Sequence, residues 1–320
     1  MRREWEPEEL ISCWTLLEDD RQLLANKSGA TRLGFALLLK YFELEGRFPR
    51  HAGEVPKAAV DYVAGQVKVA PDTFGAYQWS GRTIEYHRAQ VRKTLGFREA
   101  TVGDEDKLSA WLAEEVCPVE LSDERLREAL VARCRAERIE PPAPSRLQRV
   151  LGTAGAASEQ RFTADVASRL TAKAVAGLEA LVAESDDQQA ADASFLAELK
   201  ADPGKRNIET LAAETEKLAR VKAIGLPAEL FTESSEKLVD AWRARAARLY
   251  PSDLRASPAP VRLTLLASLC WARQTEIIDG LVDLLITLVH KVDVTAERKV
   301  GGEMLDDLRR VRGKQGLLFA

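Results

Sequence analysis

A dense group of basic and aromatic side chains lies in residues 77–98, and its chemistry suits contact with a polyanion. The whole chain has a net charge of −4, yet this stretch sets several cations against the single acid Glu85: Arg82, Arg88, Arg92, Lys93 and Arg98. Arginine and lysine neutralise phosphates, and residues near the start of a helix can reach base edges in a duplex. The stretch is therefore the first candidate for nucleic-acid binding.

The spacing of these residues predicts one amphipathic helix. Ser80 or Thr83 can begin it, and Gly96 can end it. At about 100° per residue, one narrow arc holds Ile84, Val91 and Leu95, and the opposite arc holds Arg82, Tyr86, Ala89 and Lys93. We expect these side chains in or beside a major groove: Arg82, Thr83, Tyr86, Arg88, Arg92 and Lys93. Arg82 is the best candidate for bidentate contact with guanine. The alternative is the solvated charged face of an ordinary surface helix.

The totals are those of a helix-rich globular protein. In 320 residues, the hydrophobic fraction of 46% and the charged fraction of 30% predict two or three domains with substantial cores. The pI near 5.7 argues against a chain that coats nucleic acid indiscriminately. Duplex binding must therefore come from local basic patches.

The cysteines and histidines show no metal-ligand spacing. They are scattered, with no C-x-x-C pair: Cys13, Cys117, Cys134, Cys270, His51, His87 and His290. We therefore expect no metal and no cofactor in this chain. Residues 1–6 have no apolar core of a secretory signal, and acids interrupt the apolar run from Ile277 to Val292. We expect a cytoplasmic protein that associates with the bacterial nucleoid when it is bound.

Near the start of the chain, two apolar-periodic segments surround a polar turn. We expect helices at Glu8–Leu24 and Ala30–Glu45, which together resemble a helix-turn-helix. Lys27, Arg32 and Lys40 are the candidate DNA contacts of this first module. The alternative for Lys27 and Arg32 is that they only solvate the turn.

A second module follows, with helices expected at Asp104–Glu115 and Asp123–Glu137. The second of these mixes arginines with glutamates and looks charge-paired. Three prolines in residues 141–144 then require an extended connector. Ser145 caps a short helix that carries Arg146 and Arg149, which suit phosphate better than base contact.

The domain boundaries follow from composition. The small, aperiodic run Gly152–Ala156 predicts a boundary, and Ser185–Gln189 predicts an exposed acidic link. We expect an all-α, multi-domain protein with helix-turn-helix-like DNA-binding modules at 1–75 and 76–154, followed by a helical linker and dimerisation region at 155–256 and a long-helix region at 257–320. The last helix, from Val261 to Lys291 and on toward Arg312, is apolar around much of its circumference. Its own domain or another copy must bury it.

Several strings resemble the amino-terminal region of the Tn-three family of replicative transposases. They are spread along most of the chain: Tyr77-x-Trp79-Ser80-Gly81-Arg82-Thr83, His87-Arg88, Leu95-Gly96-Phe97-Arg98, Arg32–Ala36, Arg138–Arg149, Phe195–Lys205 and His290-Lys291. The resemblance implies binding of double-stranded DNA at the terminal inverted repeats of a mobile element, by a homodimer, during DNA transposition.

The resemblance also implies which part is missing. In this family the three catalytic acids lie in a ribonuclease-H-like domain downstream of the matching region, and that domain would use divalent metal. We find no strand pattern of such a domain and no nucleophile motif, so we expect no enzymatic activity from this chain. Two alternatives stay open: a DNA-binding regulator derived from a transposase, and a helical interaction scaffold without nucleic acid.

Overall fold

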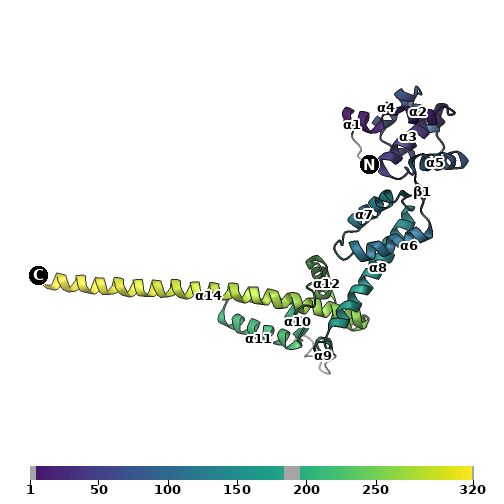
Figure 1. Cartoon of the computed structure of the whole chain (residues 1–320). Coiled ribbons are helices and arrows are strands. Elements are labelled where there is room, and N and C mark those ends of the chain that lie inside the picture. The colour runs from purple at the N-terminus through teal and green to yellow at the C-terminus, as the bar shows by residue number, and fades with distance from the viewer. Residues whose placement is uncertain (1–4, 184–194, 319–320) are drawn as a thin grey trace. The chain divides into compact units, whose positions relative to one another are not determined.

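The computed structural model describes residues 5–183 and 195–318, without the side chains of residues 309 and 311–318. The chain divides into two compact units, Met1–Ser158 and Glu159–Ala320. Within the described residues, α-helices dominate and the one sheet is a pair of two-residue strands. The predicted all-α class is therefore confirmed. Figure 1 shows the order of the elements along the chain.

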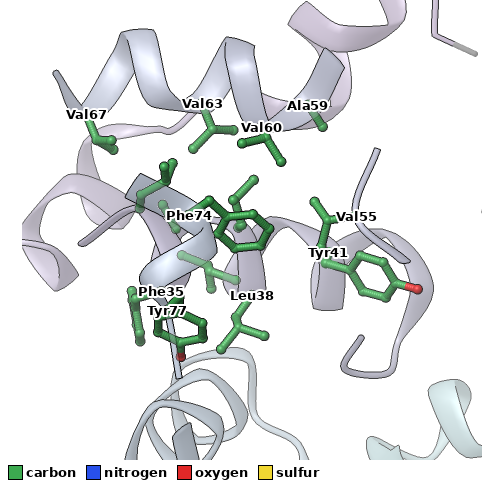
Figure 2. Packing of buried hydrophobic residues seen from close by; sticks show 14 of the residues in the cluster. Phe35, Leu38, Tyr41, Val55, Ala59, Val60, Val63, Val67, Phe74 and Tyr77 are labelled. Atoms are coloured by element: carbon green, nitrogen blue, oxygen red, sulfur yellow. The ribbon is translucent and has the colours of Figure 1, made fainter. Parts of the chain in front are cut away.

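The first core of unit 1 forms around one central helix, α3. Every residue from Leu33 to Phe42 in α3 is buried, because other helices cover it on all sides. Figure 2 shows Val60, Val63 and Val67 of α4 pointing into the same cluster as Phe35. The elements are α1 (Pro7–Trp14), α2 (Glu18–Leu23), α3 (Gly29–Glu45), η1 (Ala52–Glu54), α4 (Lys57–Val67), η2 (Pro71–Ala76) and α5 (Arg82–Leu95).

The predicted helix Glu8–Leu24 is wrong, because the chain breaks after Trp14. Thr15 has an extended conformation, with φ −71° and ψ 130°. The side chain of Gln66 on α4 takes over the local hydrogen bonds: its Oε1 accepts from Leu16 N at 2.8 Å, and its Nε2 donates to Trp14 O at 3.0 Å. A residue some 50 positions away thus satisfies the freed backbone groups, which local periodicity cannot reveal.

Gly34 explains how closely the segment before α5 approaches α3. A Cβ atom at Gly34 would lie 2.2 Å from the Tyr77 ring, well inside van der Waals contact. The absent side chain therefore lets Tyr77 pack directly on the backbone of α3. Tyr77 in turn stacks on His87 of α5. This contact links the central helix to the candidate interface.

The second core of unit 1 lies in residues 98–158. Its elements are β1 (Arg98–Glu99), α6 (Val102–Trp111), a π-helical turn η3 (Leu112–Val116), α7 (Asp123–Ala136), β2 (Ile139–Glu140) and the start of α8 (Pro144–Arg169). β1 and β2 pair in parallel, with Arg98 opposite Ile139. Residues 141–143 form the predicted non-helical connector after β2, but α8 begins at Pro144 and is 26 residues long, so the short helix with a Ser145 cap is wrong. α6 and η3 together cover the predicted helix at Asp104–Glu115.

The run Gly152–Ala156, where composition predicts a boundary, lies inside the continuous helix α8. Ala154 is fully buried in the second core, and this packing holds the helix through the two glycines. The division between the two units falls a little later in α8. The predicted acidic link Ser185–Gln189 lies outside the described residues.

Unit 2 is built on the long helix α14 (Ala259–Leu318). Residues 263–270 of this helix are buried, with Leu265, Leu266 and Cys270 all below 2% exposure, and α11 and α12 lie along α14 (Figure 1). The prediction of a long apolar helix from Val261 past Lys291 is confirmed. The remaining elements are α9 (Ala172–Ala180), α10 (Phe195–Lys200), α11 (Ile208–Ile224), α12 (Glu236–Arg248) and α13 (Pro251–Ala256).

Candidate nucleic-acid interface

Two glycines with positive φ set the ends of α5. Gly81 precedes the helix with φ 88° and Gly96 follows it with φ 72°, both values that side-chain-bearing residues rarely adopt. Past Gly96, Phe97 N donates to Arg92 O at 2.8 Å and closes the last turn. The predicted glycine turn and glycine stop are confirmed, although the helix begins at Arg82 and not at Ser80 or Thr83.

The inner face of α5 is buried on the first core. Ile84, His87 and Val91 are each no more than 2% exposed, and Leu95 packs at the edge. The sequence prediction named the apolar residues of this face and missed His87. The spacing 84, 87, 91, 95 is a helical repeat that includes it, so the signal was present.

His87 ties α5 to two other elements. Its Nδ1 lies 2.8 Å from the Tyr77 hydroxyl, and its ring meets Phe35 of α3 edge-on. Burial and, to a smaller extent, the nearby charge of Lys27 lower the pKa of His87 to about 4. The imidazole is therefore neutral at physiological pH and acts as part of the core.

The outer face of α5 carries exposed cations. Arg82, Thr83 and Lys93 are exposed, and Tyr86 shows 66% of its surface. Within the described residues, neither Arg82 nor Lys93 forms an ion pair with a carboxylate. The helix therefore presents a guanidinium, a phenol and an ammonium outward from a firmly packed base.

Arg88 and Arg92, also predicted as contacts, turn toward the protein. Arg88 Nη2 donates to Pro49 O at 3.4 Å, and its guanidinium lies over the Phe48 ring. Arg92 Nη1 pairs with Glu140 Oε2 at 2.7 Å, and its Nη2 pairs with Glu99. Only 14% of the Arg92 side chain is exposed. Burial raises the pKa of Glu140, and Arg92 opposes that shift.

The first-module cations are also held by protein groups. Lys27 Nζ donates to Leu23 O at 2.9 Å and to Gln90 Oε1 at 3.0 Å, and it lies over the Phe35 ring. Burial lowers the pKa of Lys27. Its contact with Gln90 places the turn before α3 against α5.

Lys40 and Arg32 lie on α3 itself. Lys40 is 6% exposed, and its ammonium lies 3.6 Å from Asp20 and 2.5 Å from Glu43. Arg32 is half-buried, and among the described residues its buried Nε has no hydrogen-bond partner. Because α3 is the centre of the core, we leave Lys40 out of the interface proposed below.

Arg146 and Arg149 share one buried carboxylate. Arg146 Nε lies 2.5 Å from Glu105 Oε1, and Arg149 Nη2 lies 3.3 Å from Glu105 Oε2. Glu105 is 5% exposed, so the pair joins the start of α8 to α6. The outer part of Arg149 still reaches solvent, since 66% of its side chain is exposed.

Two arginines at the end of α7 and just after it join the two cores of unit 1. Arg135 donates to the carbonyls of Leu44 at 2.7 Å and Glu43 at 2.5 Å, at the carboxyl end of α3. Arg138 Nη1 donates to Leu95 O at 3.2 Å, at the end of α5. Cations suit the negative ends of helices, where carbonyls lack partners. These contacts fix α5 relative to the second core.

A cleft of about 250 Å³ opens beside α5, where the two cores of unit 1 meet. Its lining alternates in charge: Glu85, Arg88, Arg92, Glu99, Glu140 and Arg146, with Ala100, Pro141, Pro142 and Ala143. The structure thus brings Arg88, Arg92 and Arg146 together, from segments that are far apart in the sequence. Carboxylates sit among them, whereas Arg82 and Lys93 on the outer face of α5 form no ion pair among the described residues.

The amino-acid sequence is similar to a known family and to known proteins. Residues 1–154 match the family described as Domain of unknown function (DUF4158). The transposase for transposon Tn3926 of Escherichia coli is 24% identical over 317 residues, which is 97% of this chain and 32% of the relative. The transposase for transposon Tn501 of Pseudomonas aeruginosa is 24% identical over 316 residues, with the same two shares.

Over nearly its whole length, the chain is thus similar to part of two transposases. A third relative, the transposase for transposon Tn1546 of Enterococcus faecium, is 24% identical over 196 residues, or 61% of this chain and 20% of the relative. The chain thus spans about a third of the length of the first relatives it matches, at 32%. All eleven candidate residues of this transposase-like chain fall inside the DUF4158 match.

Two further findings limit other kinds of site. In the part of the chain that the structure describes, no helix is both long enough and apolar enough to cross a bilayer. Among the same residues, no three His, Cys, Asp or Glu side chains gather as metal ligands would.

Proposed function

We propose that this chain binds double-stranded DNA at the terminal inverted repeats of a mobile element, as the end-recognition part of a transposition system. The observation that carries the proposal is the outer face of α5, where Arg82 and Lys93 stand exposed without an internal carboxylate. The names of the relatives support the transposition role. Binding at these ends would place the protein on the nucleoid.

The residues of α5 take different roles in this proposal. Arg82 lies in the first turn, where a recognition helix reaches base edges, and its planar fork matches O6 and N7 of guanine. Thr83 and Tyr86 lie on the same exposed side and contact bases or sugar. Lys93 lies in the last turn and neutralises a phosphate. The paired Arg88, Arg92, Arg146 and Arg149 act from the edge of the contact and toward phosphate.

We further propose that this region recognises DNA ends and does not cut them, and that it acts as a homodimer. The resemblance supports the first point, since it places the catalytic acids of the family downstream of the matched region. Support for the second point comes from the apolar surface of α14, described below.

Titration of fluorescent duplexes tests the proposal. Arg82→Ala should cost about 1–3 kcal/mol on the cognate terminal repeat and much less on a scrambled duplex. Lys93→Ala should weaken both duplexes alike and reduce the slope of log K against log salt by about one. Lys237→Ala is the matched control, because Lys237 is an exposed lysine on α12 in the other unit. If Arg82→Ala and Lys237→Ala behave alike on the terminal repeat, α5 is not the recognition helix.

A protein-interaction scaffold is the second candidate, and the internal pairing of Lys40, Arg92 and Arg146 favours it. Those pairs show that much of the basic character of unit 1 serves the fold. The scaffold requires that no duplex binds at either of two salt concentrations. A transposase-derived regulator would bind the same ends alone, and a neighbouring reading frame that supplies the catalytic domain separates it from the transposition role.

A further inference from the structure

An apolar stripe runs along the exposed side of α14. Ile278 is 38% exposed, Val282 52%, Leu285 53%, Val289 53% and Val292 66%. They follow one another in steps of four, three, four and three residues. This is the spacing of the a and d positions of a coiled coil, which keep one seam on one side of a helix.

The stripe is separate from the face that α14 packs on its own unit. Ile277 and Leu284 are buried, and Leu281 is partly buried against the same core. At 100° per residue, these residues centre about 90° around the helix from the centre of the stripe. Figure 1 shows α11 beside only part of α14, which continues alone toward its end. Each residue of the stripe nevertheless stays 38–66% exposed in the structure.

The residue types along the stripe specify a partner. With Val282 and Val289 at a, the d positions are Ile278, Leu285 and Val292. Branched residues at a with leucine at the central d favour parallel two-stranded coiled coils. We propose that residues 278–292 form the seam of a parallel coiled coil with α14 of a second copy of this chain.

The charges beside the seam choose the parallel direction. In an antiparallel pair that aligns the whole stripe, Asp279 of one copy lies beside Asp293 of the other, and like charges at these positions are unfavourable. In the parallel pair, Leu281 lies beside Ile286 and Leu288 beside Asp293, so no like charges meet. The exposed Ile286, at 62%, then gains apolar contact at the edge of the seam.

The seam is short, at about 22 Å for fifteen residues, but its helix is already formed. Isolated helices of this length are marginal in water because nucleation is costly. Here the buried segment 263–270 of α14 and the contact with α11 fix the helix before it meets a partner. Association therefore gains apolar burial without also having to order the chain. Lys299, at the next d position after Ala296, ends the seam.

Analytical ultracentrifugation of the 320-residue chain tests whether this stripe is a dimer interface, because it measures the dimer dissociation constant. Leu285→Arg and Val289→Glu should each raise the dimer dissociation constant by about tenfold or more, since each places a charge in the seam. Leu305→Lys is the control, because Leu305 is 58% exposed and lies about 200° around the helix from Leu285. A chain that stays monomeric, or a dimer that neither seam variant weakens, overturns the proposal.

Cysteine cross-linking tests the direction. In a Cys13→Ser background, the other three native cysteines are buried. In a parallel pair, the cysteine of Ile278→Cys should then form a disulfide with the same cysteine of the second copy. Cross-linking only between Ile278→Cys and Ala296→Cys chains would show an antiparallel pair and overturn the parallel assignment. This inference deepens the proposed homodimer, and its failure leaves terminal-repeat binding to be judged separately by the Arg82→Ala titration.

Discussion

The two cores of unit 1 both carry many arginines, and they use them differently. On the outer face of α5, Arg82 and Lys93 meet no carboxylate among the described residues. In the second core, Arg146 and Arg149 share Glu105, while Arg98 pairs with Asp104 at 2.5 Å. This difference shows that the number of arginines in a segment is a poor guide to DNA contact. What matters is whether the fold supplies each cation with an acid.

The largest effect that we expect is on the pH dependence of stability, through His87 on the buried side of α5. The folded-state pKa of His87 is about 4, against about 6.5 when unfolded, so only the unfolded chain takes up this proton between those pH values. The contribution of neutral His87 to the free energy of unfolding, roughly 3 kcal/mol, is complete above pH 6.5 and is lost as the pH falls toward 4. Urea unfolding at pH 7 and pH 4.5 measures it.

The comparison variant for this measurement is His87→Asn, which keeps a polar atom near the Tyr77 hydroxyl. Carboxylates also titrate in this window, so the informative quantity is the difference in pH slope between the two proteins. The variant should show a clearly shallower loss of stability on acidification. Equal slopes would mean that the imidazole is protonated within the fold, and that the buried side of α5 packs less tightly on the first core than the structure shows.

Arg92 tests whether position or pairing decides the role of a cation, because it lies on α5 and yet is paired. Arg92→Ala leaves Glu140, with 21% of its side chain exposed, without its cation, and should lower the free energy of unfolding by about 2 kcal/mol. Binding of the folded protein to the terminal repeat should change less than in Arg82→Ala. Chemical denaturation and duplex titration on one preparation give both values. A larger binding loss than in Arg82→Ala would make Arg92 a direct DNA contact.

The smallest effect is expected in the second core. Glu105→Gln removes the charge that Arg146 and Arg149 share, and should lower stability by about 1 kcal/mol, since both arginines reach solvent. Their release should strengthen binding to any duplex by about twofold, the size of a surface electrostatic term near 0.5 kcal/mol. Anisotropy with cognate and scrambled duplexes measures the change. Unchanged affinity for both duplexes would exclude Arg146 and Arg149 as phosphate contacts.

Local patterns in the sequence determined much of this molecule. The composition indicated an all-α protein, the two glycines marked the ends of α5, and the prolines of residues 141–144 marked the non-helical segment before α8. The periodicity of Ile84, Val91 and Leu95 identified the packed side of α5, and so left Arg82 and Lys93 on the other side. These features depend on neighbours within about one helical turn, which is why the sequence shows them.

Only the tertiary structure decided which cations remain exposed, because their partners come from distant segments. Arg92 pairs with Glu140, Arg149 with Glu105, and Arg135 with the end of α3, across separations of 48, 44 and about 90 residues. The break after Trp14 likewise depends on Gln66, 52 residues away. Helical periodicity describes one segment at a time, whereas a charge is neutralised by whichever acid the packing of several segments brings within reach.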